Sequence, residues 1–200
     1  MEFLEEVPMP EEQPDARKVF IIHGRNENAV VAVEHFLRSL KLDPIDFDEL
    51  AANVGGSAFI GDIVREGMRQ AQGIVALFTA DEFSSLRPEF RKSRDSKADK
   101  ERWQARPNVI FEAGMAYGMA KERVFLVVLG AQVELFSDVS GIHLLHLNNS
   151  VQSRSSFRQK LIGIGCEVDQ KTGLWSDYTK AGDFEGCVVL QGVKTRSPFC

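Results

Sequence analysis

Glu112 is the one charged residue in a long apolar stretch of the sequence. Between Asn108 and Ala120 no other side chain carries a charge, and Pro107 suits the first position of a helix, where its missing N–H needs no partner. Burying an unpaired carboxylate costs several kcal/mol, so its retention in an apolar helix needs a reason. We expect a partly buried catalytic or ligand-binding carboxylate at the floor of a cleft. The alternative is an ion pair with Arg25 or Arg106.

A single fixed carboxylate suits the cleavage of an N-glycosidic bond whose base is already cationic, as in the nicotinamide riboside bond of NAD. The base then departs neutral and no general acid is required. The oxocarbenium ion on the ribose does need stabilisation, which a carboxylate provides electrostatically. The two carboxylates of ordinary glycoside hydrolysis thus reduce to one, and Glu112 is the candidate for that role.

Apolar runs that alternate with helical patterns predict the elements around Glu112. Five runs are typical of buried strands, namely Lys18–Ile22, Leu42–Phe47, Gly73–Thr79, Arg123–Leu129 and Ile142–Leu147. A helix capped by Asn26 is expected after the first run, and a last helix capped by Ser153 or Ser155 after the fifth. The sequence therefore predicts an α/β fold of flavodoxin-like type, with a five-stranded parallel sheet and helices on both faces.

Ligands of such sheets bind at the carboxyl ends of the strands, where the strand order reverses. That rule brings the segments 23–25 and 79–81 to the start of the Glu112 helix. The expected substrate-binding residues are His23, Gly24, Arg25, Asn26, Ser57, Phe59, Asp81 and Asn108. Arg25 would contact phosphate through its planar donors, or else form a salt bridge. His23 would contact the ligand or only shape the turn, and the loop at Ser57–Phe59 would close over the ligand.

Composition limits the remaining possibilities. The net charge of −5 favours neither nucleic acid nor anionic membranes as partners. No apolar run approaches the ~20 residues of a membrane helix, and the N-terminus does not resemble a signal peptide, so a cytoplasmic protein is expected. The four histidines form no metal-binding pattern. Cys166, Cys187 and Cys200 also lack metal-ligand spacing and are expected to be reduced thiols, so no metal site is predicted.

Three segments are expected along the chain. Residues 1–16 are acidic, contain three prolines and predict a flexible leader. Residues 17–165 carry the strands and helices of the domain, and residues 166–200 form a C-terminal extension whose role the sequence does not assign. Within the domain, residues 87–106 are dense in both charge signs and predict a surface insertion, with a basic binding patch as the alternative.

Several of these motifs resemble one bacterial family. They are Val19–Arg25, Thr79–Glu82, Ala105–Gly114, Arg123–Val124 and Ser137–Gly141. Their order is similar to that in the TIR-like domains described as predicted nucleotide-binding proteins, a bacterial branch of the Toll/interleukin-1 receptor superfamily. The resemblance covers about residues 17–165, and the block Asn108–Glu112 is its most specific part. It implies a TIR-type three-layer sandwich.

The resemblance implies a function as well as a fold. The family's NAD-cleaving glutamate falls on Glu112, with NAD as substrate and no cofactor. Members typically act as assembly-activated effectors in antiphage defence, joined to or working beside a module that senses a cyclic nucleotide. A homo-oligomer on activation is therefore expected, together with such a sensing partner or a sensor domain lost from this sequence. Activation would order the loop at about residues 51–59.

Two other functions stay open at this point. A non-catalytic TIR module would bind nucleotide or partners and would tolerate the loss of the Glu112 charge. A nucleoside deoxyribosyltransferase-like enzyme would also place a carboxylate on ribose but would exchange bases on deoxynucleosides. The sequence does not distinguish hydrolysis of NAD from its cyclisation.

Overall fold

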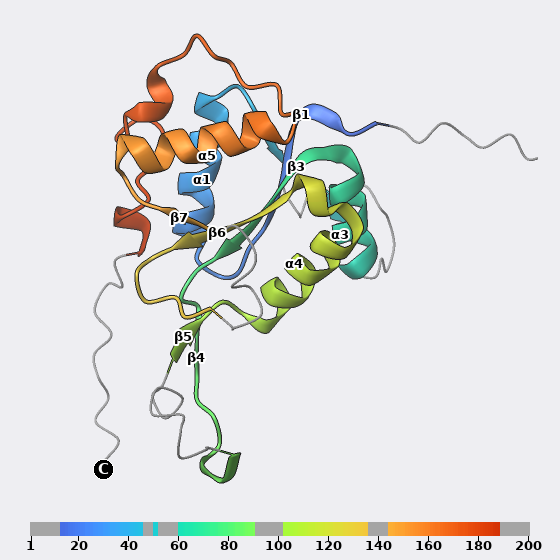
Figure 1. Ribbon diagram of the computed structural model, residues 1–200, viewed down its shortest axis with the longest axis vertical. Coiled ribbons are helices and arrows are strands. Elements are labelled where there is room, and N and C mark those ends of the chain that lie inside the picture. The colour runs from blue at the N-terminus through green and yellow to red at the C-terminus, as the bar shows by residue number, and fades with distance from the viewer. Residues whose placement is uncertain (1–12, 46–49, 52–59, 91–101, 136–143, 189–200) are drawn as a thin grey trace, which may run out of the picture.

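A five-stranded, all-parallel sheet forms the centre of the computed structural model, which describes residues 13–45, 50–51, 60–90, 102–135 and 144–188. Its strands are β1 (Asp15–Ile22), β2 (Asp43–Ile45), β3 (Ala71–Phe78), β6 (Val124–Leu129) and β7 (Leu144–Leu147). They lie in the order β2-β1-β3-β6-β7 (Figure 1). The predicted fold class is confirmed.

Helices cover both faces of this sheet, as Figure 1 shows. One face carries α1 (Glu27–Ser39) and α5 (Val151–Gly163); the other carries α3 (Ile60–Gln70) and α4 (Pro107–Ala120). Burial on both faces of the sheet explains why the sequence of β1 is a continuous apolar run. Val19 and Ile21 belong to the core under α1 and α5, while Phe20 and Ile22 belong to the core under α3 and α4. Both faces of the strand are therefore buried.

The helix starts follow local chemistry. The Asn26 side chain accepts a hydrogen bond from the Ala29 N–H at 3.1 Å, and Pro107 takes the first position of α4, both as predicted. The expected cap of α5 at Ser153 or Ser155 was wrong. Ser150 is the cap, because its hydroxyl accepts from the Ser153 N–H at 3.2 Å. Strand β1 also begins at Asp15, two residues inside the expected leader.

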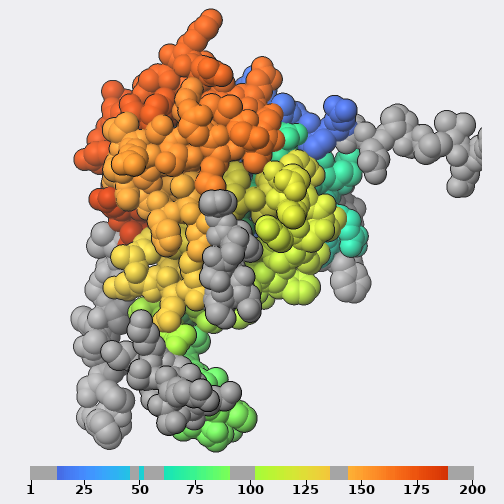
Figure 2. Space-filling model, viewed as in Figure 1, coloured from blue at the N-terminus to red at the C-terminus, as the bar shows by residue number. Residues whose placement is uncertain are grey.

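The expected surface insertion at residues 87–106 follows one strand of a small antiparallel ribbon and contains the other. Its strands are β4 (Glu82–Ser84) and β5 (Arg102–Gln104), and a 3-10 turn at Pro88–Phe90 follows β4. The rings of Phe83 and Trp103 pack edge to face with centres 4.8 Å apart. The ribbon and the 3-10 turn project away from the main sheet in Figures 1 and 2.

The described part of the C-terminal extension, residues 166–188, packs onto the domain. Cys166, Val168, Ala181 and Phe184 are buried, and Phe184 tilts against Phe36 of α1 with ring centres 5.6 Å apart. Cys166 and Cys187 are free thiols, as expected, and burial raises the pKa of Cys166 to about 12 and that of Cys187 to about 11. Cys200 lies outside the described residues. In the described ranges, no helix has the length and apolar character needed to cross a bilayer.

Arg154 of α5 holds this segment in place. Its side chain is fully buried and donates hydrogen bonds to the main-chain carbonyls of Trp175, Ala181 and Gly182. Its guanidinium carbon lies 5.0 Å from the ring centre of Phe36 and 4.6 Å from that of Phe184, so the cation contacts two aromatic rings that also pack against each other. Burial lowers the pKa of Arg154 to about 10, which leaves the side chain charged at neutral pH.

We predict that Arg154→Ala destabilises the protein by about 3 kcal/mol, because three buried carbonyls lose their donor and two rings lose their stacking partner. The free energy of unfolding is measured by urea denaturation, and limited proteolysis reports on residues 166–188. Arg38→Ala is the matched control, since Arg38 makes only an exposed ion pair with Glu34 on α1. Equal stability of the Arg154 variant and the wild type would contradict this role.

Candidate functional site

Asp81 ties together the carboxyl ends of the two central strands. Its Oδ2 accepts a hydrogen bond from the Arg25 N–H at 2.8 Å, and its Oδ1 accepts one from the Thr79 hydroxyl at 2.7 Å. A Cβ atom on Gly24 would overlap Oδ2 of Asp81, so a larger residue at position 24 would have to displace this carboxylate. The structure thus brings the segments after β1 and β3 together, at the reversal of strand order that the sequence indicated. Both oxygens of Asp81 are used in this bridge.

Glu112 lies on α4 and is partly buried, as expected. Burial raises the pKa of its carboxyl above the ordinary 4.5, and electrostatic interaction with the His23 and Arg106 side chains opposes this effect. The ion pair weighed as an alternative is not formed: Arg106 Nε instead bonds Glu82 at 3.2 Å, and no salt bridge joins Glu112 to Arg25 within the described part of the chain. The carboxylate therefore lies near two basic side chains without being neutralised by direct contact.

The other predicted residues differ in how far their side chains are engaged. His23 Nδ1 lies 3.0 Å from the Gly24 carbonyl, which orients the ring. Arg25 is exposed. The Asn26 oxygen caps α1, and its Nδ2 donates to the Cys187 carbonyl at 3.3 Å, so the amide joins this loop to the C-terminal segment. Asn108 is exposed in the first turn of α4. Ser57 and Phe59 lie outside the described residues.

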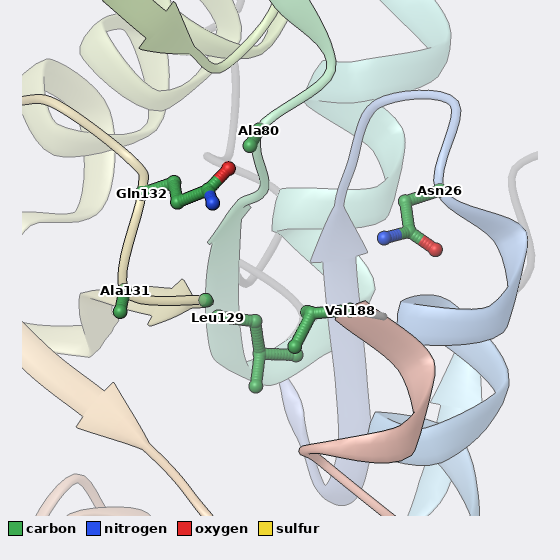
Figure 3. A pocket seen from close by; sticks show the side chains of 7 residues that line it. Asn26, Ala80, Leu129, Ala131, Gln132 and Val188 are labelled. Carbon is green, nitrogen blue, oxygen red and sulfur yellow. The ribbon is translucent and has the colours of Figure 1, made fainter. Parts of the chain in front are cut away.

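A cavity of about 380 Å³ opens at the same edge of the sheet, beyond Asn26 (Figure 3). Its lining comprises Asn26, Ala80, Leu129, Gly130, Ala131, Gln132 and Val188. A second cavity of about 400 Å³ shares Gly130, Ala131 and Val188 with it. A site after β6 was not among the sequence-based predictions, although ligands of such sheets bind at the carboxyl ends of strands and β6 ends here. Val188 could not be anticipated, because it comes from the extension.

We predict that Glu112→Gln stabilises the fold at neutral pH. Because burial raises the pKa of Glu112 in the folded state above 4.5, folded protein holds the proton more tightly than unfolded protein. Stability is full while the carboxyl is neutral in both states and is lost as the pH rises through the raised pKa. Glutamine stays neutral and avoids this loss.

The check is the melting temperature of both proteins from pH 4 to pH 8. The variant should melt higher at pH 7.5, and the gap should close at low pH. Glu122→Gln, at an exposed position just after α4, is the matched control. A Glu112→Gln gap that does not change with pH would contradict the burial effect.

We also predict that Gly24→Ala costs about 1–3 kcal/mol of stability, the usual effect of forcing a methyl group into a filled space. The added Cβ would displace the Asp81 carboxylate and so loosen the junction of β1 and β3. Urea denaturation measures the loss. Gly118→Ala on α4 is the control, because nothing lies within 4 Å of the Cβ added there. If Gly24→Ala were as stable as Gly118→Ala, the position of the Asp81 carboxylate beside Gly24 would not hold the ends of β1 and β3 together.

Comparison with known proteins gives two findings. The chain is 26% identical over 150 residues to the uncharacterized protein YuaY of Escherichia coli (strain K12). That alignment covers 75% of this chain and 45% of YuaY, so the chain spans less than half the length of this relative. The protein-family model for the TIR domain of CAP12/Pycsar effector proteins matches residues 18–149. This match includes every described strand of the central sheet except the start of β1, together with α4 and Glu112. The chain belongs to the CAP12/Pycsar effector TIR domain family.

Proposed function

We propose that this domain binds NAD or a related nucleotide and cleaves its N-glycosidic bond to nicotinamide, with Glu112 as the catalytic carboxylate. The supporting observation is the environment of that carboxylate. It is partly buried on an apolar helix, its pKa is raised, and His23 and Arg106 lie close enough to act on it without a direct ion pair. Membership of a family of TIR effector domains agrees with this role.

In the proposed reaction the bond between ribose C1′ and the pyridinium nitrogen breaks. Its electron pair moves onto the nitrogen, so nicotinamide leaves as a neutral base. The positive charge that develops on the ribose is stabilised by the ionised Glu112 carboxylate. A water oxygen then bonds to C1′ and releases a proton, which gives ADP-ribose; attack by a nitrogen of the same molecule would give a cyclic product instead.

The neighbouring residues would bind the substrate. Arg25 is exposed beside the N-terminus of α1, where a helix dipole and a guanidinium together favour phosphate. Asn108 is exposed near Glu112 and would hydrogen-bond a ribose hydroxyl. Asp81 would act indirectly, because both of its oxygens hold the loop that carries Arg25.

Activation by self-assembly is part of this proposal, as for an effector in antiphage defence. The outward face of α4 supports it. Phe111 and Met119 are 69% and 53% exposed there, and nothing lies within 4 Å of a Cβ built on Gly114 or Gly118 between them. A helix that is apolar on all sides normally has both faces covered. A second copy of the domain could cover this face next to Glu112.

The test is NAD turnover by the purified protein at high concentration, in which released nicotinamide and the ADP-ribose product are followed. Glu112→Gln is nearly isosteric and removes only the charge, so we expect turnover to fall at least about a hundredfold, the usual effect of losing a group that stabilises developing charge. Glu122→Gln removes an exposed carboxylate just beyond the same helix and should turn over NAD like the wild type.

The outcomes separate the functions. Loss of turnover in Glu112→Gln alone supports catalysis by this carboxylate, and a linear or cyclic product identifies hydrolase or cyclase. Base exchange on deoxynucleosides without NAD cleavage would favour a deoxyribosyltransferase. Absence of turnover by the wild type, even when assembly is forced, would favour a non-catalytic module that binds nucleotides or partners.

A further inference from the structure

The cavity in Figure 3 has a wall that lies outside the part of the chain matched by the family model. Val188 belongs to the C-terminal segment, while the family match ends at residue 149. Val188 faces Gly130 closely, since a Cβ built on that glycine would lie 3.6 Å from the valine. Asn26 fixes the preceding residue through its hydrogen bond to the Cys187 carbonyl. Cavity and C-terminal segment therefore form one unit.

The lining of this cavity indicates an uncharged ligand. None of the described residues that line it is charged, and Leu129 and Val188 supply apolar surface. The Gln132 amide points toward Ala80 in Figure 3 and offers N–H donors and a carbonyl acceptor. A side-chain amide matches the N6 and N7 edge of adenine. A volume of about 380 Å³ also lies within the usual range of small-molecule sites.

Phosphate fits this place poorly. The lining of the adjoining cavity of about 400 Å³ includes His146 and Glu185, and the Glu185 carboxylate would repel an anion. Positive charge lies on the other side, where His23 and Arg106 act on Glu112 and Arg25 is exposed. The edge of the sheet thus has basic side chains around Glu112 and an uncharged, partly apolar cavity at Val188.

One short loop connects these two halves. It begins at His23, near Glu112, and ends at Asn26, which lines the cavity. Arg25 lies between its ends and offers a guanidinium for phosphate, and α1 begins directly after Asn26, where a helix terminus favours phosphate as well. A molecule laid along this loop would meet a carboxylate, then phosphate-binding groups, then a neutral cavity. That order corresponds to the nicotinamide riboside, pyrophosphate and adenine parts of NAD.

We propose that the cavity between β6 and the C-terminal segment binds the adenine ring of the substrate, with Val188 as its apolar wall and Gln132 as its hydrogen-bonding partner. The orientation of NAD in this proposal rests on the proposed function. Binding of the adenine ring does not, because the cavity and its lining exist independently of any reaction. Residues 166–188, held by Arg154, then contribute to substrate selection as well as to stability.

Two variants test this site. Val188→Trp fills the cavity, and Gln132→Leu removes the amide at an exposed position where the fold is not at risk. Gln159→Leu, the same change at an exposed position of α5, is the matched control. Calorimetric titration with AMP measures base binding in each protein, with ribose 5-phosphate as the ligand without a base. Where NAD is cleaved, the ratio of kcat/KM for NAD to that for nicotinamide mononucleotide, which lacks adenosine, is the second measurement.

We expect AMP to bind the wild type and Gln159→Leu more tightly than ribose 5-phosphate does, and both cavity variants to weaken AMP binding about tenfold, a loss of about 1.4 kcal/mol. The NAD preference should fall by a similar factor. AMP that does not bind, or binds all four proteins equally, would overturn the proposal. Absence of NAD cleavage with AMP binding lost in both cavity variants would refute the proposed function but uphold the adenine site.

Discussion

The hydrogen bond between the Asp81 carboxylate and the Arg25 N–H joins the loops that follow β1 and β3 at the carboxyl edge of the sheet. One carboxylate receives the Arg25 N–H and the Thr79 hydroxyl, and the absence of a side chain on Gly24 lets it approach the first loop. The chain leaves β1 toward one face of the sheet and β3 toward the other, so the loops would otherwise diverge here. With the loops joined, Arg25 and Asn26 hold a defined position relative to Glu112.

The residues around Glu112 give a reason for its unfavourable burial. Its helix is held by apolar contacts of Val109, Ala113 and Ala116, which are indifferent to the carboxylate. Apolar neighbours therefore hold the destabilising Glu112 carboxylate in place without neutralising it. Arg106 pairs with Glu82 instead. A carboxylate that is not paired with a cation can interact with a positive charge on a bound ligand. In the proposed reaction, the carboxylate that lowers stability is also the group that stabilises the charge on the ribose.

The sequence predicted those features that depend on local pattern. The continuous apolar run of β1 indicated a strand buried on both faces, and Asn26 and Pro107 marked two helix starts correctly. Strands of three residues, as in β4 and β5, are too short to show a period. The burial of Arg154 was also invisible, because its partners are main-chain carbonyls of a distant segment, which any residue type supplies. The cavity beside Val188 depends on that same docking.

The carboxyl edge of the sheet is built from two parts of the chain, the part matched by the family model and the C-terminal segment 166–188. Arg25 and Glu112 belong to the part matched by the TIR family model, whereas Val188 comes from outside it. Arg154 fixes the segment through carbonyls and aromatic rings, interactions that do not specify the residues at its end. Residue 188 can therefore change without loss of the contacts by which Arg154 holds this segment. In such an arrangement the charge at Glu112 and the shape of the cavity can change separately, so a shared reaction and a particular ligand preference can be combined in one domain.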